Sequence, residues 1–268
     1  MDTPNRKTSI RKIASYSVLA LLAVIVGAVT LLWQMERKAS VCRGIRVNVQ
    51  DSVSIGFVSE GDVLEFLGER YGSLRDVPVD SIDLAAIEHH LSSGRGILRS
   101  EVYLTPDGLL HADIRQRSPI ARIQTPKGAF YCDAEGYLLP VSPRYITRVQ
   151  IVDGDIALPV DKDFAGFLPE GPEHDYLMQV VGLIRHINRS PLWRENIGEI
   201  HVEKGGELTL LLRERPERFL FGQPKGYAAK LARMEKYFNR VLPLRSEEDT
   251  PYKSVNVQYK GQIICRNK

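Results

Sequence analysis

An uncharged stretch near the N-terminus constrains this chain more than any other feature. Residues 13–35 read IASYSVLALLAVIVGAVTLLWQM, without one formally charged side chain. At about 1.5 Å per residue, such a helix is long enough to cross a hydrocarbon core of about 30 Å, which requires roughly 20 apolar residues. Tyr16 and Trp33 lie near its two ends, where amphipathic rings prefer the headgroup level. The sequence therefore predicts a transmembrane helix over residues 13–35.

Two other kinds of apolar N-terminal segment fit less well. A cleaved signal peptide has an apolar core of about 7 to 15 residues followed by a cleavage site of small residues. Glu36, Arg37 and Lys38 follow the stretch instead. Residues 39–41 (Ala-Ser-Val) do not match the sequence expected before a lipidated cysteine at Cys42. We therefore expect an uncleaved membrane anchor.

Charge gives little help with the orientation of this anchor, because basic residues flank both of its ends. A short N-terminal tail before a large C-terminal region usually leaves the large region on the far side of the membrane. We therefore expect residues 1–12 to form a cytoplasmic tail and everything after residue 35 to be exported.

Charge and cysteine content limit the possible ligands. The first twelve residues contain four basic residues and one acidic residue, so their net charge is +3, the same as the formal net charge of the whole chain. The remainder is balanced and has no run of Lys or Arg, which argues against nucleic acid and against a polybasic lipid-binding surface. The three cysteines, Cys42, Cys132 and Cys265, are too widely spaced for a zinc site. A Cys132–Cys265 bridge and buried free thiols are both compatible with the sequence.

The first exported segment begins with a strand and a helix. Residues 42–49 alternate apolar and polar side chains, which places Val47 and Val49 on one face of a strand. Ser59 then caps a helix, with Asp62 in a capping-box position. The apolar residues of this helix have helical spacing: Val63, Leu64, Phe66, Leu67 and Tyr71.

A second helix and a hairpin follow. Asp80 is the candidate cap of this helix and Gly94 its stop. Its apolar stripe consists of Leu84, Ile87 and Leu91. The Pro-Asp-Gly sequence at residues 106–108 then joins strands at residues 102–104 and 110–114. The order β-α-α-β-β predicts an α+β unit, with a three-stranded sheet and two helices over one face.

From residue 116 onward the pattern becomes mostly β, with two or three helices. Turn-rich sequences separate short apolar runs, and two longer stretches, residues 175–188 and 227–241, have helical stripes. Strands are expected at residues 120–123, 129–133, 137–139, 200–202, 208–212, 218–221, 255–259 and 262–265. We therefore expect two exported domains, at residues 42–115 and 116–268.

The residue types that could support catalysis or metal binding do not form recognisable motifs. Residues 88–90 (Glu-His-His) contain metal-binding side chains, but adjacent histidines on a helix point about 100° apart and no ligand at i+4 completes a site. We therefore predict that they lie on a solvated helix face. Asp153 and Asp155 could serve as hydrolase carboxylates, but their surroundings are typical of a turn. Cys132 lies in a strand-like run, away from any nucleophile motif. We expect no enzymatic activity, cofactor, metal or small-molecule substrate.

An anchor that displays two sheet-containing domains is typical of an interaction protein, whose surfaces are sheet edges and helix faces. Val255, Val257 and Tyr259 alternate with polar residues, so one face of this strand should lie on the core. Only residues 266–268 follow the last expected strand, at residues 262–265, which is therefore expected to be an edge. Edge strands present unpaired backbone groups that can accept a strand from a partner. Alternatively, the polar and basic terminal residues shield this edge.

Several short sequences occur along the chain in an order that is also found in a known protein family. They are FVSEGDV at 57–63, SEV at 100–102, DGL at 107–109, PIA at 119–121, DAEG at 133–136, FG at 221–222 and SVNVQY at 254–259. In this order, and together with the arrangement of the elements, they resemble the bacterial FtsQ/DivIB cell-division family over some 220 residues, from the anchor to the last strand. The sequence departs from the family at two places. Ser254 stands where the family often has a tyrosine, and residues 116–119 (Gln-Arg-Ser-Pro) lack the acidic residue that often precedes the basic one ahead of the family's proline.

This resemblance implies a POTRA domain at residues 42–115 and a β domain at residues 116–268. It implies a non-enzymatic scaffold of the septal division complex in the cell inner membrane, with a periplasmic C-terminal region that recruits and links membrane-anchored division proteins. FtsB-like and FtsL-like proteins would bind by strand addition. The implied partner-binding residues are Ser254, Val255, Asn256, Val257, Gln258, Tyr259, Lys260, Gln262, Ile263 and Ile264.

Two other functions stay open. One is a POTRA-type periplasmic assembly factor or chaperone, and the other is a membrane-anchored cell-wall hydrolase.

Overall fold

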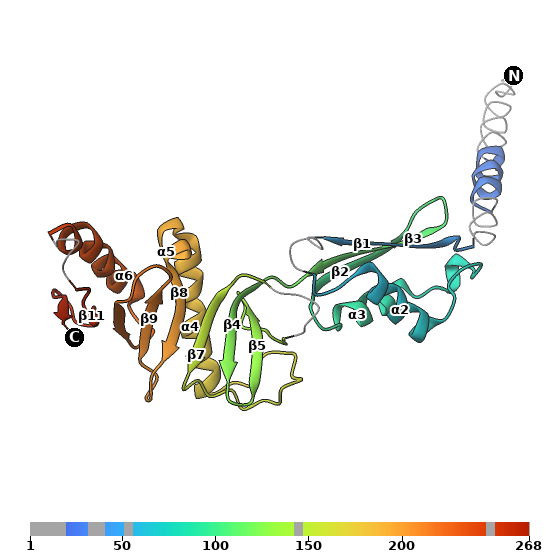
Figure 1. The fold of residues 1–268 in the computed structure, drawn as a ribbon. Coiled ribbons are helices and arrows are strands. Elements are labelled where there is room, and N and C mark those ends of the chain that lie inside the picture. The colour runs from blue at the N-terminus through green and yellow to red at the C-terminus, as the bar shows by residue number, and fades with distance from the viewer. Residues whose placement is uncertain (1–19, 32–40, 51–55, 142–146, 245–249, 268) are drawn as a thin grey trace, which may run out of the picture. The chain divides into compact units, whose positions relative to one another are not determined.

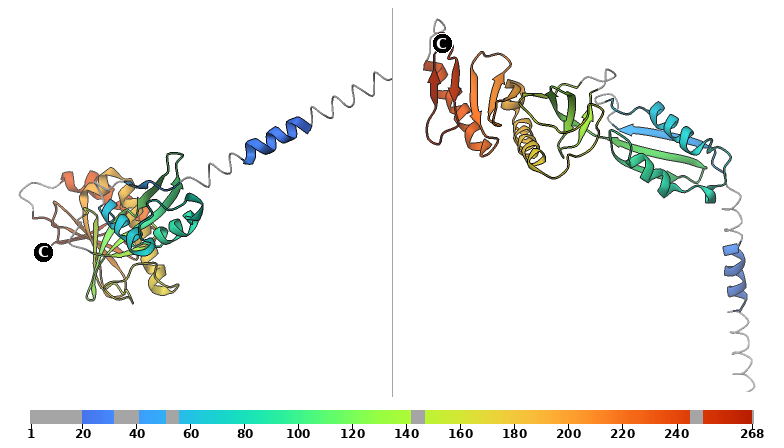
Figure 2. Two further views of the ribbon diagram at one scale, coloured as in Figure 1. Left: turned by 90° about the vertical axis from the view of Figure 1, so that its right-hand side faces the viewer. Right: turned by 90° about the horizontal axis from the view of Figure 1, so that it is seen from below.

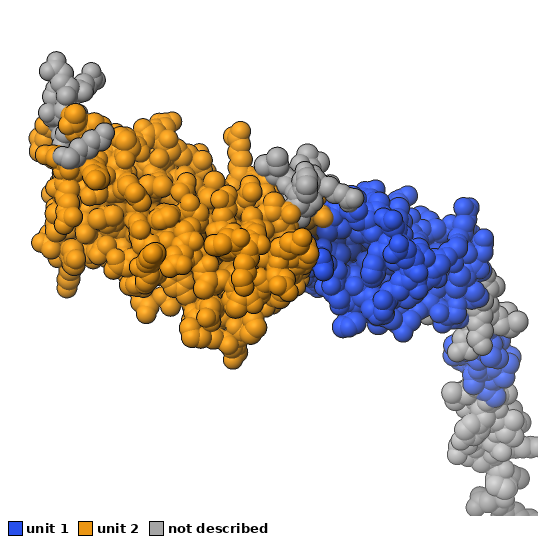
Figure 3. Space-filling model, turned by 60° about the horizontal axis from the view of Figure 1, so that its bottom comes forward, with its two compact units in different colours: residues 1–50, 58–115 blue, residues 51–57, 116–268 orange. Residues whose placement is uncertain are grey.

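The computed structural model describes residues 20–31, 41–50, 56–141, 147–244 and 250–267. The chain divides into two compact units. Unit 1 lies within residues 1–50 and 58–115, and unit 2 comprises residues 51–57 and 116–268 (Figure 3).

Part of the expected membrane anchor is helical. Residues 20–31 form a helix with almost every side chain exposed, and Thr30 donates its hydroxyl to the carbonyls of Val26 and Gly27. The remaining parts of the expected span, residues 13–19 and 32–35, lie outside the described residues. Within the ranges described above, no helix combines the length and the apolar character needed to cross a bilayer.

Unit 1 has the β-α-α-β-β order that the sequence predicts (Figure 1). Its elements are β1 (Gly44–Gln50), α2 (Glu60–Tyr71), the 3-10 turn η1 (Val79–Ser81), α3 (Leu84–Ser92), β2 (Ile97–Leu104) and β3 (Leu109–Gln116). The strand order is β1-β3-β2, and β1 pairs in parallel with β3 from Gly44 opposite Leu109 to Gln50 opposite Arg115. Both α2 and α3 lie on one side of this sheet.

Local sequence explains where these helices start. The Ser59 side chain accepts from the Asp62 N–H and the Asp62 carboxylate accepts from the Ser59 N–H, so the predicted capping box is present. The predicted cap of α3 is wrong: Asp80 lies in η1, and Asp83 accepts from the Ala86 N–H at 2.9 Å. Leu64, expected in the buried stripe of α2, is exposed.

The Glu-His-His sequence in α3 also differs from the expected solvated face. Glu88 accepts from the Val102 N–H at 3.1 Å, so its carboxylate satisfies a backbone donor of β2, an outer strand of the sheet. His90 contacts Arg70 and the Tyr71 hydroxyl through its two ring nitrogens. Two of the three side chains therefore join α3 to its neighbours.

Unit 2 is built on one nine-stranded sheet, in the order β12-β11-β10-β9-β8-β7-β4-β5-β6. Figure 2 follows this sheet from the green strands β4 and β5 to the red C-terminal strands. The strands are β4 (Pro119–Thr125), β5 (Gly128–Asp133), β6 (Leu138–Pro140), β7 (Gln150–Gly154), β8 (Ile197–Val202), β9 (Leu208–Leu212), β10 (Arg218–Gly222), β11 (Ser254–Asn256) and β12 (Ile264–Arg266). The helical segments are α4 (Pro172–Arg189), α5 (Pro191–Asn196), α6 (Tyr227–Lys236), the π-helical turn η2 (Tyr237–Val241) and the 3-10 turn η3 (Leu242–Leu244).

One face of this sheet supports the core. The 18-residue helix α4 buries a stripe of six apolar side chains: Leu177, Val180, Val181, Leu183, Ile184 and Ile187. These pack with alternate residues of the strands, among them Ile123, Val152 and Ile200. Alternation turns the intervening residues, such as Arg122, Ile151 and Glu199, toward the opposite face.

Two local predictions for unit 2 were wrong. The sequence around Asp153 forms strand β7 rather than a turn, and the chain turns only at Gly154, with φ of +95°. The last two strands are shorter than predicted, since β11 ends at Asn256 and β12 starts at Ile264.

The three cysteines form no disulfide with one another. Cys42 and Cys132 are buried, and Cys265 is half-buried in β12. Burial, reinforced by the neighbouring Asp133 charge, raises the pKa of the Cys132 thiol. Because the thiolate is the reactive form, this cysteine is a packing residue rather than a nucleophile.

Candidate functional site

The strand β12 is an edge strand of the nine-stranded sheet. It pairs in antiparallel fashion with β11, from Ser254 opposite Arg266 to Asn256 opposite Ile264, and it is the outermost strand at this side. On its inner side, β11 pairs in parallel with β10. The free side of β12 is the edge that the sequence predicts as a partner-binding surface.

The structure separates the ten predicted site residues into three groups. Val255 and Val257 are fully buried, so only their backbones are available to a partner. Ser254, Asn256, Gln258 and Ile263 are half-buried, and Tyr259, Lys260, Gln262 and Ile264 are exposed. Tyr259, expected on the core face, is 52% exposed, because β11 ends three residues earlier. Ile263 packs partly against the core ahead of β12, and Ile264 lies in that strand.

A set of hydrogen bonds fixes the chain where it leaves β11. The Val257 N–H donates to the Leu220 carbonyl at 3.0 Å, and the Gln258 N–H donates to Asn256 Oδ1 at 2.9 Å. Arg233 of α6 donates from Nε to the Val257 carbonyl at 2.8 Å. The helix α6 therefore holds the segment that leads to the edge strand, a role of Arg233 that the sequence pattern did not indicate.

A basic groove of about 520 Å³ lies beside this segment. One wall is α6, through Ala229, Ala232, Arg233 and Lys236, and the other is formed by residues 260–263. The two alanines keep the helix wall low, while Arg233, Lys236 and Lys260 bring positive charge to its rim. The charge of this groove is therefore suited to acidic side chains.

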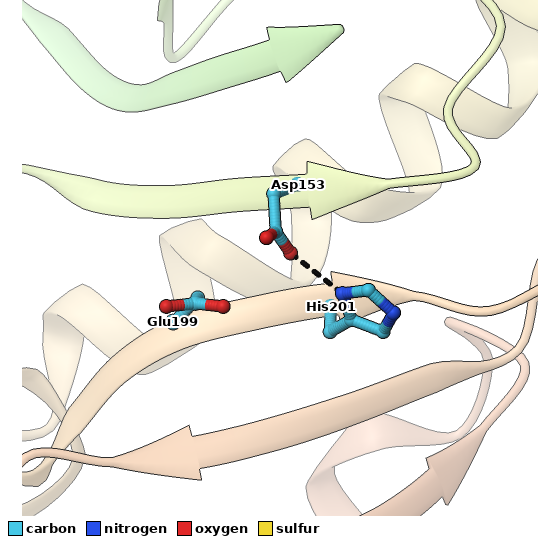
Figure 4. A group of neighbouring side chains, drawn as sticks. All are labelled: Asp153, Glu199 and His201. Carbon is cyan, nitrogen blue, oxygen red and sulfur yellow. Dashed lines mark hydrogen bonds and ion pairs between the residues drawn. The ribbon is translucent and has the colours of Figure 1, made fainter.

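A second polar group lies on the open face of the sheet (Figure 4). Asp153 of β7 bonds His201 of β8 through Nδ1 at 2.8 Å, and Glu199 lies two residues before His201 on the same strand. Their potential ligand atoms all lie within 4.8 Å of one another, and no other such trio occurs in the part of the chain that the structure describes. The sequence did not reveal this group, because β7 and β8 are distant in the chain.

The chemistry of this trio is mainly that of a hydrogen-bonded network. Partial burial, and then the neighbouring Asp153, raise the pKa of Glu199. The second ring nitrogen of His201, Nε2, lies 3.8 Å from the Glu203 carboxylate. Glu203 also accepts hydrogen bonds from Thr209 and Arg218. Two carboxylates and an imidazole are donors of the kind that bind divalent cations, but their contacts with each other already account for their positions.

Comparison with known families assigns both parts of the chain. The family model described as FtsQ/DivIB, C-terminal related, matches residues 118–266. A POTRA-like domain model matches residues 40–115. No curated protein matches the chain. The first model covers more than half of the sequence and includes the whole sheet of unit 2. This confirms the resemblance seen in the sequence, and the chain belongs to the FtsQ/DivIB C-terminal-related family and carries a POTRA-like domain.

Proposed function

We propose that this protein is a non-enzymatic scaffold of the bacterial septal division complex, held in the inner membrane by residues 13–35. Its exported units would recruit and link other membrane-anchored division proteins, including FtsB-like and FtsL-like partners. Membership of the FtsQ/DivIB-related family supports a role in cell division. The observation that carries the proposal is the outer strand β12, which lies close in sequence to the basic groove that includes Lys260 and Ile263.

In this proposal a partner adds an extended segment to the free side of β12. Main-chain hydrogen bonds would supply most of the affinity, because Val255 and Val257 are buried and cannot offer side chains. The basic groove would then select a partner with acidic residues next to its strand. Side-chain changes at Ser254, Gln258 or Lys260 should therefore weaken binding less than a change that removes a backbone donor.

Two proline variants in β12 test strand addition. Successive N–H groups of a strand point to opposite edges, so Ile264→Pro and Cys265→Pro remove donors from different sides. We expect one variant to lose co-purification with the FtsB-like partner while its thermal unfolding stays near that of the wild type. The other should mainly lower stability, because it breaks a bond to β11. Full partner binding by both variants, each shown to be folded, would place the interface elsewhere.

The anchor and the POTRA unit need separate tests. A reporter that functions only outside the cytoplasm, fused after Lys268, should be active; an inactive fusion would contradict the proposed orientation. Deleting residues 42–115 should disperse the protein from the division site, and unchanged septal localisation would argue against a recruiting role for this unit.

The POTRA-like match also supports a second candidate, a periplasmic assembly factor or chaperone. Depletion of the protein distinguishes the two functions. Filamentous cells with normal outer-membrane proteins support the division scaffold, whereas loss of outer-membrane proteins in cells of normal length supports the assembly factor.

A further inference from the structure

A second groove lies on unit 2, away from the edge strand. It has a volume of about 610 Å³, which is within the range of roughly 300–1,000 Å³ found for ligand pockets. Its lining residues are Arg122, Thr147, Arg148, Val149, Ile151, Arg194, Glu195 and Arg213. They come from β4, from residues 147–151 that lead into β7, from α5 and from the residue after β9, so the fold gathers four arginines from four separate segments.

Most of this positive charge has no counterion among the residues that the structure describes. Arg194 bonds Glu195 through Nε at 3.1 Å, and this pair neutralises itself. Arg122, Arg148 and Arg213 form no ion pair with any residue that the structure describes. Three arginines elsewhere in unit 2 differ, since Arg117, Arg215 and Arg218 each contact a carboxylate. The groove is therefore a concentration of uncompensated cations.

Two polar atoms at this groove also lack partners. Arg122 Nε and Thr147 Oγ1 are both inaccessible to solvent and have no hydrogen-bond partner among the described residues. A buried donor without an acceptor costs free energy, so native proteins rarely retain one without a reason. A guanidinium is matched best by a carboxylate, which can accept two parallel hydrogen bonds from it.

The groove also extends along apolar surface. Val149 and Ile151 line it, and an adjoining hollow of about 360 Å³ shares Ile151 and Arg213 and adds Leu211, Leu212 and Glu199. At Gly198 an added Cβ would lie only 3.0 Å from Arg213 Cγ, so the glycine gives the arginine side chain room beside β8. A single phosphate would fill a small part of this space. An extended segment with alternating acidic and apolar side chains would use both the charge and the apolar lining.

We propose that this groove binds an acidic peptide segment of a partner protein, with carboxylates on Arg122, Arg148 and Arg213 and apolar side chains on Val149 and Ile151. This surface is distinct from β12, and the inference does not depend on strand addition at that edge.

Fluorescence anisotropy tests the proposal on the full chain in detergent micelles. The probe is a fluorescein-labelled heptapeptide of alternating glutamate and valine. We expect saturable binding, which Arg122→Gln and Arg213→Gln each weaken by about tenfold, and which Gly198→Ala also weakens by displacing Arg213. Arg185→Gln on the exposed side of α4 is the matched control, since it removes the same charge outside the groove.

Several outcomes would overturn the proposal. They are absence of binding, equal losses for Arg185→Gln and Arg122→Gln, and equal binding of a peptide with glutamine in place of glutamate. Displacement of the probe by inorganic phosphate at matched charge would mean that the groove is a simple anion site. Displacement by anionic phospholipid vesicles at matched charge would mean that it is a lipid-binding surface. The Ile264→Pro and Cys265→Pro variants should bind the probe normally, which separates this result from the test of β12.

Discussion

Arg117 donates from Nη1 to Asp133 Oδ2 at 2.6 Å, and both side chains are almost completely buried. The guanidinium carbon also lies 3.8 Å from the centre of the Tyr137 ring. Asp133 accepts in turn from the N–H groups of Glu135 and Tyr137, which shapes the turn after β5. One ion pair therefore joins the segment before β4 to the end of β5, at the start of unit 2.

Removing Arg117 should be strongly destabilising, because it leaves the Asp133 carboxylate buried without its cation. We predict that Arg117→Ala lowers the free energy of unfolding of unit 2 by about 3–5 kcal/mol. Glu135→Gln is the control, since this second partner is exposed and should contribute less than about 1 kcal/mol. Urea unfolding measures both values, and similar losses for the two variants would contradict the assignment.

Gly154 is the last residue of β7, and its position leaves no room for a side chain. Its φ is +95°, and an added Cβ would lie 2.2 Å from the Val202 carbonyl oxygen. Gly154→Ala should therefore cost about 3 kcal/mol or more, by forcing β7 and β8 apart. Gly205→Ala is the matched control, because Gly205 has a similar φ of +91° but no atom within 4 Å of the added Cβ. It should cost only about 1–2 kcal/mol, and thermal unfolding compares the two.

The start of α3 can be tested with two aspartates. Asp83 accepts from the Ala86 N–H, whereas Asp80 makes no side-chain cap at η1. We predict that Asp83→Ala speeds amide hydrogen exchange in the first turn of α3, corresponding to about 1 kcal/mol, and that Asp80→Ala has little effect. Faster exchange in the Asp80 variant alone would indicate that Asp80, as predicted from the sequence, is the cap of α3.

Glu217 should make unit 2 sensitive to acid. Burial raises the pKa of this carboxylate, but hydrogen bonds from Arg215, from its own backbone and from Tyr237 outweigh burial and leave the pKa below its ordinary value. The resulting stabilisation is present above the unfolded pKa of about 4.3 and is lost as the pH falls through the lower folded value. The difference in unfolding free energy between the wild type and Glu217→Gln should therefore shrink between pH 7 and pH 3. A difference that does not change with pH would contradict this.

Much of unit 1 could be predicted because its signals are local. Ser59 and Asp62 lie three residues apart, and the turn at residues 106–108 has the residues that such a turn requires. The cap of α3 could not be predicted in the same way, because Asp80 and Asp83 both precede the same apolar stripe, and only the backbone conformation decides which one caps the helix. Strand β7 was missed for a similar reason, because Asp153 and Gly154 dominate its short sequence.

The candidate sites were predicted less completely, since they depend on contacts distant in sequence. The edge at β12 could be expected from alternation near residue 255, but Arg233 and the α6 wall of the basic groove could not. Arg122 and Arg213 line one groove only because β4, β7, β8 and β9 are neighbours in that order. No local pattern encodes that order.

The parallel pairing of β1 with β3 has a mechanical consequence. The chain enters this pair at Gly44 and leaves it after Arg115, at opposite ends of seven paired residues. Tension along the chain pulls the two strands past each other in opposite directions. It thus loads the inter-strand hydrogen bonds together, in shear, instead of opening them one after another as in a peeled hairpin. A domain built in this way can transmit a pulling force from the chain before it to the chain after it without coming apart.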